Sequence, residues 1–213
     1  MNNKNSEEQI AILQGYYQFH ARIYDLTRWL FLFGRNEVLQ HIALDSQTAF
    51  TLIEVGCGTG KNLFPLATRF PRVNLIGYDI SPDMLQVAEK KLAHLNKTQL
   101  TLIPRPYNLS EPVRNCDVVL FSYTLSMINP QYREAISQAY RDLKLGGRII
   151  VVDFFDATPL YKKFMLLNHV RMDSHLLPAL QELFNTDYLS IRRAYLGVWQ
   201  YFLFVGRKLS DHK

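Results

Sequence analysis

Three glycines at alternate positions, placed directly after an apolar run, constrain the fold of this sequence more than any other feature. The stretch reads TLIEVGCGTG over residues 51–60, so Gly56, Gly58 and Gly60 follow Glu54. Such an apolar run is typical of a buried parallel strand. Glycines after the strand let the backbone turn sharply and approach a ligand closely. Residues 61–70 predict a helix, and a loop leading into a helix N-terminus is typical of nucleotide sites in doubly wound α/β sheets.

The spacing of these glycines differs from two common phosphate-binding loops. A dinucleotide fingerprint is G-x-G-x-x-G, and here Gly60 comes one residue too early. A P-loop is G-x-x-x-x-G-K-[ST], but Asn62 stands where its Ser or Thr belongs, and its first glycine is misplaced. The remaining pattern is E-x-G-x-G-x-G. The alternative to a binding loop is an ordinary glycine-rich turn.

A second acid, Asp79, ends the next apolar run, VNLIGY over residues 73–78, which predicts a second buried strand. It stands 19 residues after Gly60. An acid at about this distance from a glycine loop can accept hydrogen bonds from both hydroxyls of a ribose. The alternative is a surface carboxylate in a strand-to-helix turn.

Taken together, these motifs resemble motif I and the ribose acid of the class I S-adenosylmethionine (SAM) methyltransferases. The stretch LKLGGRIIVVD at residues 143–153 resembles another turn of that superfamily. The resemblance implies a Rossmann-like, doubly wound α/β fold whose seven-stranded sheet is parallel except for its last strand, with an N-terminal helical lid. It implies SAM as cofactor, S-adenosylhomocysteine as product and no metal. The cofactor-binding residues that it implies are Glu54, Gly56, Cys57, Gly58, Thr59, Gly60, Asn62, Asp79, Ile80, Met84, Asn108, Leu109 and Ser122.

Two of these residues have particular expected roles. Glu54 would order the glycine loop or bind the methionine ammonium through water. Asn108 lies in PRPYNLS, residues 104–110, where the superfamily often places an acid that contacts adenine. An amide there departs from the pattern, but it can still form a hydrogen bond with the exocyclic amine of adenine.

Composition indicates one globular domain with a sizeable core, because the 213 residues are 48% hydrophobic and 20% charged. The polar start MNNKNSEEQ does not resemble a signal peptide, and no apolar run reaches 18 residues. Cys57 and Cys116 lack metal-ligand spacing, so we expect free thiols in a reducing, cytoplasmic compartment. The net charge of +5 permits an anionic membrane or nucleic acid as partner; we expect no nucleic acid.

The chain is predicted to divide into four parts of one domain. These are an N-terminal helical segment (1–45), a SAM-binding core (50–155), an amphipathic segment (157–185) and a closing hairpin (188–206). Strands at 99–103, 117–121 and 148–153 alternate with helices, which favours a mostly parallel sheet. Further expectations are helices over 7–33 and 35–43, a helix capped by Ser81, and a helix capped and started by Asn129-Pro130. For His20, in the first helix, a core or interface role is favoured over that of a catalytic base.

A narrower resemblance lies in the stretch YYQFHARIYDLTRWLFLFGR, residues 16–35. It is similar to the N-terminal segment of the betaine-lipid N-methyltransferases, which methylate the amino group of diacylglyceryl-homoserine to the trimethylated betaine lipid. This similarity implies that the acceptor is the amine of a lipid headgroup. The alternatives are a phosphatidylethanolamine N-methyltransferase, a methyltransferase for a soluble molecule or a quinone, and, from another class, a non-catalytic SAM-binding interaction module.

Direct methyl transfer to an amine requires few catalytic groups, because proximity and orientation dominate. The amine must be neutral, and a model α-amino group has a pKa of roughly 8. Tyr24, Tyr123 and Ser126 are the candidates to position it. Methylated amines are cations, which aromatic faces attract by roughly 0.5–2 kcal/mol.

A lipid acceptor implies peripheral attachment to the inner face of the membrane, without a transmembrane segment. The aromatic residues of 16–33 and the 157–185 segment, with Lys162, Lys163 and Arg171, are the candidates for contact with the headgroup boundary. The alternative is that both segments pack on the core of the protein, as amphipathic helices of α/β domains usually do.

Overall fold

The computed structural model describes residues 32–42, 44–93, 99–107, 113, 115–167 and 170–210. Most of the aromatic helix predicted over 7–33, including His20 and Tyr24, lies outside these residues. So do Asn108 and Leu109.

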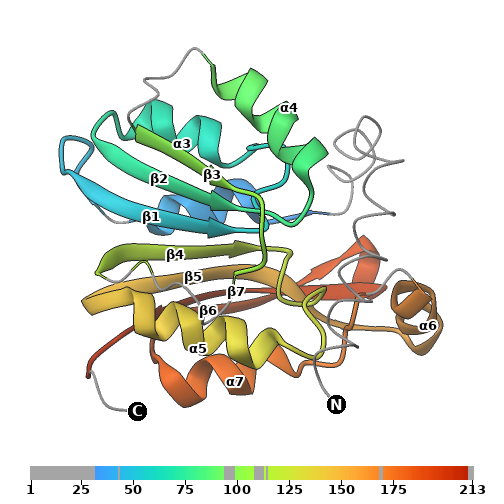
Figure 1. Ribbon diagram of the computed structural model, residues 1–213. Helices are drawn as coiled ribbons and strands as arrows, with labels where there is room; N and C mark the ends of the chain where they lie inside the picture. Colours follow the sequence, from blue (N-terminus) through green and yellow to red (C-terminus); the bar gives the residue numbers. More distant parts are fainter. Residues whose placement is uncertain are drawn as a thin grey trace, which may run out of the picture.

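One seven-stranded sheet forms the centre of the molecule (Figure 1), in the order β3-β2-β1-β4-β5-β7-β6. Strands β1 to β5 are paired in parallel, and β7 is antiparallel to both β5 and β6. The predicted fold class is therefore confirmed. The strands are β1 (Phe50–Val55), β2 (Val73–Tyr78), β3 (Leu100–Ile103), β4 (Cys116–Ser122), β5 (Leu143–Ala157), β6 (Asn185–Ala194) and β7 (Trp199–Arg207).

The central strands read as apolar runs because both of their faces are covered. In β1, Leu52 packs into the core on one face and Ile53 into the core on the other. The first core is shared with α2 (Arg35–Val38), η1 (Leu39–His41), α3 (Leu63–Arg69) and α4 (Pro82–Leu92). The second core is shared with α5 (Tyr132–Asp142) and α7 (Leu176–Leu183). This burial on two sides is why the strands lack an alternating pattern.

One prediction about the ends of the helices is correct, and two others differ from the structure. Ser81 caps α4, because its hydroxyl accepts the N–H of Met84 at 3.3 Å. The helix predicted over 35–43 is wrong in extent: it is one α turn and one 3-10 turn, and Ile42 then leaves helical geometry and is buried. Asn129 is not the cap of α5, which begins two residues after Pro130; its side-chain amide instead donates to the carbonyl of Ser126 at 2.7 Å.

The amphipathic segment predicted over 157–185 contains two helices with opposite environments. Helix α6 (Pro159–Leu167) buries none of its side chains, whereas α7 buries Leu176, Leu177, Ala179 and Leu180. Strands β6 and β7 pair as an antiparallel hairpin through the 3-10 turn η3 (Tyr195–Gly197), and β6 begins three residues before the predicted start of the hairpin at 188. No helix in the described part of the chain is long and apolar enough to cross a membrane.

Candidate functional site

The glycine loop lies at the carboxyl end of β1 and is tied to the neighbouring strand. The N–H groups of Gly56 and Cys57 both donate to the carbonyl of Tyr78, at 2.8 and 3.0 Å. Tyr78 is the last residue of β2, and its successor is Asp79. The loop and the second acid are therefore neighbours at one edge of the sheet, as the sequence predicted.

The three loop glycines all have left-handed backbone conformations, with φ of +70°, +53° and +72° at Gly56, Gly58 and Gly60. A Cβ atom at Gly56 would lie 2.5 Å from the side chain of Thr124, so that glycine allows the loop to pass the end of β4. A Cβ at Gly58 would meet no atom within 4 Å. Gly58 thus borders open space, where a ligand can approach the backbone.

Glu54 is fully buried beneath this loop. Its Oε1 accepts a hydrogen bond of 2.6 Å from the Nδ2 atom of Asn62, the N-cap residue of α3, and so fixes the exit of the loop. Its Oε2 has no hydrogen-bond partner among the described residues. Burial raises the pKa of Glu54 from 4.5 to about 7, although the nearby charge of Arg35 opposes the increase. The carboxylate is therefore anchored on one side and available to a cationic group on the other.

This raised pKa predicts how Glu54 affects stability as a function of pH. Between pH 4.5 and about 7 the folded protein keeps a proton that the unfolded chain loses, so stability falls as the pH rises. Above pH 7 the ionised, buried Glu54 lowers the free energy of unfolding by about 3 kcal/mol. Glu54→Gln should therefore be more stable than wild type at pH 8 and equally stable at pH 4, by urea unfolding. An equal difference in stability between the variant and wild type at both pH values would contradict the raised pKa of Glu54.

Asp79 organises the loop through both of its carboxylate oxygens. Oδ2 accepts the N–H of Gly58 at 2.8 Å, and Oδ1 accepts the N–H of Ser81 at 2.9 Å. Burial raises the pKa of Asp79, and hydrogen bonds from the backbone N–H groups oppose this increase. An acid in this position connects the glycine loop to the start of α4, and it lies beside Gly58 at the open side of the loop.

The other residues predicted to bind cofactor lie around the same edge. Cys57, Thr59 and Met84 are buried, and Ile80 is half-buried. The thiol of Cys57 lies against Gly77, and burial raises its pKa, so it remains a thiol. Ser122, at the carboxyl end of β4, has a buried hydroxyl without a hydrogen-bond partner among the described residues. The roles of these residues in binding remain predictions.

Tyr123, a candidate to position the amine, is engaged by other parts of the protein through both its hydroxyl and its ring. It follows β4 with a left-handed backbone (φ +57°), and its N–H donates to the carbonyl of Val152. Its hydroxyl donates to the carbonyl of Phe33 at 2.7 Å, and its ring packs against Phe154 with centroids 4.7 Å apart. The side chain is buried. Tyr123 thus joins the end of β4 to the chain that leads into α2.

A substitution at Tyr123 separates a structural role of its hydroxyl from a role in positioning the amine. Tyr123→Phe should lower the free energy of unfolding by about 1–3 kcal/mol, because the buried carbonyl of Phe33 loses its donor. The measurement is thermal or urea unfolding, with Tyr161→Phe on α6 as the control. Unchanged stability together with a lower turnover number would instead support the amine-positioning role.

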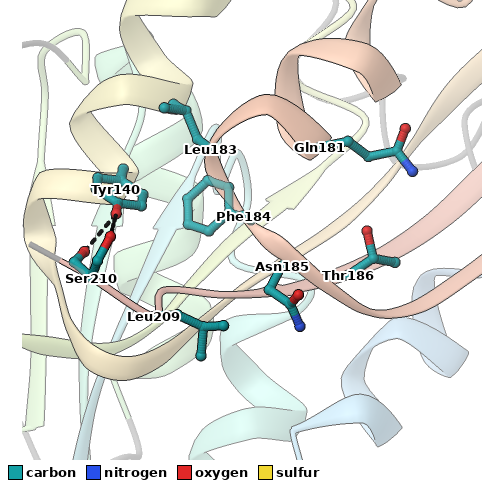
Figure 2. A pocket seen from close by; sticks show the side chains of 8 residues that line it. All are labelled: Tyr140, Gln181, Leu183, Phe184, Asn185, Thr186, Leu209 and Ser210. Carbon is teal, nitrogen blue, oxygen red and sulfur yellow. Dashed lines mark hydrogen bonds between the residues drawn. The ribbon is translucent and has the colours of Figure 1, made fainter. Parts of the chain in front are cut away.

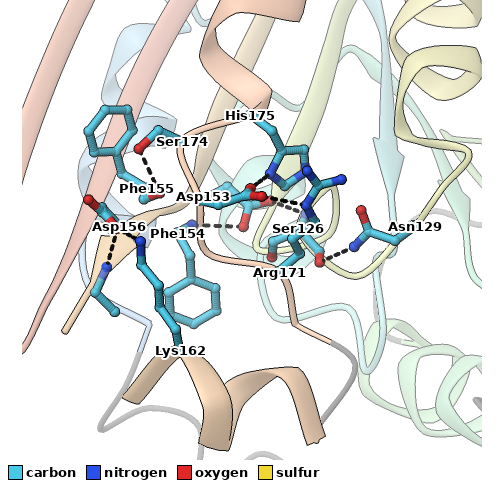
Figure 3. A network of polar contacts seen from close by, with 12 residues as sticks. Ser126, Asn129, Asp153, Phe154, Phe155, Asp156, Lys162, Arg171, Ser174 and His175 are labelled. Atoms are coloured by element: carbon cyan, nitrogen blue, oxygen red, sulfur yellow. Dashed lines mark hydrogen bonds and ion pairs between the residues drawn. The ribbon is translucent and has the colours of Figure 1, made fainter. Parts of the chain in front are cut away.

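Ser126 lies in a polar network between the loop after β4 and the last residues of β5 (Figure 3). Its N–H donates to Oδ2 of the fully buried Asp153 at 3.2 Å, and its carbonyl accepts bonds from Asn129 and from the N–H of Arg171. The hydroxyl of Ser126 is buried and has no partner among the described residues. Burial raises the pKa of Asp153 to about 6. Asp153 thus holds the main chain of the loop that carries Tyr123 and Ser126.

Aromatic rings gather next to this loop, on the side towards β7. Phe33 contacts Tyr195, Trp199 and Tyr201 with ring centroids 5.6 to 6.2 Å apart, and Phe154 contacts Trp199 at 5.1 Å. We call these five residues the aromatic cluster. The indole N–H of Trp199 is buried without a hydrogen-bond partner among the described residues. Phe33 and Tyr195 are partly exposed, so the cluster also presents ring surface to solvent.

A cavity of about 460 Å³ lies elsewhere (Figure 2), between the C-terminal ends of α5 and α7. Its lining includes Asn185 and Thr186, at the start of β6, and Leu209 beyond β7. The end of β7 pairs with the start of β5, Arg207 opposite Arg148. This cavity is therefore at the amino edge of the parallel strands, opposite the glycine loop, and does not belong to the site.

Three residues of the site were not predicted from the sequence. The hydroxyl of Thr124 donates to the carbonyl of Val55, and its side chain packs over Gly56. Arg35 provides positive charge near Glu54, and Asp153 accepts a hydrogen bond from the loop after β4. Of these three, only Asp153 could have been found from the sequence, because it is an acid at the end of an apolar run that predicts a strand.

Comparison with known proteins agrees with this geometry. Residues 53–149 match the family model described as "Methyltransferase domain". The chain is 28% identical over 140 residues to the ubiquinone/menaquinone biosynthesis C-methyltransferase of Syntrophotalea carbinolica, covering 63% of this chain and 58% of that protein. The chain spans about half the length of the curated relatives that it matches.

Two solved structures show the same fold at low sequence identity. The N-methyltransferase NodS of Bradyrhizobium japonicum WM9, in complex with S-adenosylhomocysteine, has a TM-score of 0.68 at 16% identity and covers 83% of this chain and 86% of its own. Phospholethanolamine N-methyltransferase 2 of Haemonchus contortus has a TM-score of 0.69 at 14% identity, and the match covers 86% of this chain and 56% of that one.

The residues present fit the cofactor of such proteins: a glycine loop open at Gly58, an anchored carboxylate with one unpartnered oxygen at Glu54, and an acid at the end of β2. The match to the methyltransferase domain bears out the expectation that SAM is the cofactor. By its strand order, its glycine loop and its match to the methyltransferase domain over residues 53–149, this chain has the fold of the SAM-dependent methyltransferases to which it is similar.

Proposed function

We propose that this protein is a SAM-dependent N-methyltransferase that methylates the amine of a lipid headgroup. The observation that carries the proposal is the position of the aromatic cluster beside the loop after β4, at the same edge of the sheet as the glycine loop. Aromatic rings stabilise the cationic amines that successive N-methylations produce. Diacylglyceryl-homoserine is the expected acceptor, because residues 16–35 resemble the enzymes that methylate it.

The residues that would hold the cofactor are those already tied together at this edge. Gly58 leaves room for it, Asp79 would accept from its ribose, and Glu54 would face its ammonium group. The cofactor supplies an activated methyl group on a sulfonium whose leaving group is a neutral thioether. The protein need only orient the acceptor and exclude water, which suits a site formed mainly by rings and backbone. Two buried carboxylates whose pKa is raised, Glu54 and Asp153, are candidates to take up a proton near neutral pH.

A second candidate acceptor is a quinone ring, methylated on carbon. Two curated relatives, the protein of Syntrophotalea carbinolica and the demethylmenaquinone methyltransferase of Lactococcus lactis, carry quinone methyltransferase names. The latter is 30% identical over 119 residues. A neutral aromatic acceptor would also stack on the aromatic cluster.

One experiment separates these functions. The protein is incubated with SAM labelled in the methyl group and a lipid extract that contains both diacylglyceryl-homoserine and demethylmenaquinone. Products are then identified by mass. A labelled betaine lipid supports the proposal, and a labelled quinone replaces it with the second candidate. No labelled product, with tight SAM binding retained, would favour a non-catalytic binding module.

Tyr24 provides a further prediction, because it lies in the stretch that resembles the lipid enzymes, is a candidate to position the amine and is outside the described residues. Tyr24→Phe should lower the turnover number several-fold and leave SAM affinity unchanged. The measurements are steady-state kinetics and titration calorimetry. Collapse of SAM affinity with turnover retained at saturation would assign Tyr24 to the cofactor lid.

A further inference from the structure

Helix α6 and turn η3 expose large apolar side chains to an unusual degree. Leu160 and Leu167 of α6 are each 82% exposed, and Leu196 at the tip of η3 is fully exposed. Phe164 and Leu166 are more than half exposed, and Val198 follows the turn. We call these six residues the apolar rim. Large apolar side chains exposed together on neighbouring elements are a feature of interaction sites.

The contrast with α7 shows that this exposure is specific to α6. Both helices are short and rich in leucine, and they are separated by only eight residues. Helix α7 buries Leu176, Leu177 and Leu180 against the sheet, whereas α6 buries no side chain. Helix α6 touches the first core only through the partly buried Tyr161 and Met165, and its leucines are exposed to solvent.

The two elements of the apolar rim are joined and adjoin the site. The N–H of Thr158, just before α6, donates to the carbonyl of Val198, just after η3, at 3.0 Å. Helix α6 begins two residues after β5 ends, at the carboxyl edge of the sheet (Figure 1). In η3, Tyr195 contacts Phe33 of the aromatic cluster with centroids 5.6 Å apart. The apolar rim thus borders the proposed acceptor site.

Basic side chains flank the apolar rim. Lys163 on α6 and Arg193 at the end of β6 are exposed, and neither forms an ion pair with another described residue. Lys162 is paired with Asp156. Leucines that project from two neighbouring elements, with cations beside them, match the apolar interior and anionic surface of a bilayer.

We propose that the apolar rim docks on an anionic lipid bilayer, with Leu196 inserted at the headgroup boundary, and so places the acceptor site over the membrane. The inference rests on the proposed function only for the identity of the headgroup. Helix α6 lies along the surface and η3 points into it. A substrate with two acyl chains then reaches the site without leaving the bilayer.

The test uses the full chain and vesicles of phosphatidylethanolamine and phosphatidylglycerol in a sedimentation assay. Leu196→Asn preserves the backbone, because asparagine tolerates the left-handed conformation (φ +56°) of this residue. Combined with Leu167→Asn, it should reduce vesicle binding about tenfold or more. The control is Leu145→Asn, a half-exposed leucine at the amino edge. Lys163→Gln with Arg193→Gln should reduce binding to anionic vesicles by about fivefold per residue, and Lys90→Gln should not.

Three results would overturn the docking surface. The first is vesicle binding that the leucine variant leaves unchanged. The second is a marked loss of thermal stability in that variant, since the rim would then be covered by another part of the chain. The third is a dimer in sedimentation velocity that the variant dissociates, because the occupant would be a second copy.

The assay also separates this inference from the proposed function. Methylation of detergent-dispersed lipid amine without vesicle binding would overturn the docking surface alone. Vesicle binding that depends on Leu196, without methylation of any lipid amine, would overturn the proposed function alone. Binding of S-adenosylhomocysteine, measured by titration calorimetry, should be the same in all of these variants.

Discussion

Asp79→Ala should weaken SAM binding at least tenfold while the protein remains folded. In the structure Asp79 accepts the N–H groups of Gly58 and Ser81, so its loss removes both the proposed ribose acceptor and the support of the glycine loop. Hydrogen bonds to a charged acceptor contribute about 1.5–3 kcal/mol each. The loss of even one such bond corresponds to about a tenfold change in the dissociation constant.

Titration calorimetry with SAM, S-adenosylhomocysteine and NAD measures this effect. The control is Asp83→Ala, an exposed acid in the first turn of α4 that makes none of these bonds. Wild type should bind both SAM and S-adenosylhomocysteine and should show no binding of NAD. An unchanged dissociation constant in folded Asp79→Ala would show that the ribose binds elsewhere, and comparable affinity for NAD would contradict the cofactor assignment.

Alanine at Gly58 should weaken cofactor binding at least tenfold at a small cost in stability, whereas alanine at Gly56 should destabilise the fold. Both residues have positive φ, which costs a non-glycine residue about 1–2 kcal/mol. A Cβ at Gly58 projects into open space beside Asp79 and would occupy the approach of the cofactor. A Cβ at Gly56 would overlap Thr124 at 2.5 Å, and that overlap adds to the backbone cost.

Urea unfolding and calorimetry on the same variants distinguish the two effects. Gly146→Ala is the matched control, since its φ is +75° and a Cβ there would also meet no atom within 4 Å, but it lies at the amino edge of β5. Gly58→Ala should match Gly146→Ala in stability and lose at least tenfold in SAM affinity. Equal SAM affinity in these two variants would place the cofactor away from Gly58.

The local features of the site could be predicted from the sequence because their physical causes are short-range. The glycine loop depends on backbone conformations that glycine alone adopts easily, and Ser81 caps α4 through a residue three positions away. The strands could be located because burial on both faces requires continuous apolar runs. Asp79 reaches Gly58 because β1 and β2 are parallel neighbours, a pairing that the alternation of strands and helices predicts.

Only the tertiary structure decided which side chains meet across long stretches of chain. Tyr123 reads as a candidate to position an amine, but its hydroxyl reaches the carbonyl of Phe33, 90 residues away. Nothing in the local pattern of either residue encodes that contact. The position of Arg35 near Glu54 likewise depends on how α2 packs on the sheet.

The amphipathic segment shows the same limit. By sequence, α6 and α7 lie in one amphipathic segment, which is a candidate for a membrane face or for the core. Helix α7 meets α5 and the second core, so its leucines are buried. Helix α6 follows the end of β5 and reaches the first core only through Tyr161 and Met165, so its leucines stay exposed. Hydrophobicity determines that a side chain avoids water; the path of the chain determines what it can pack against.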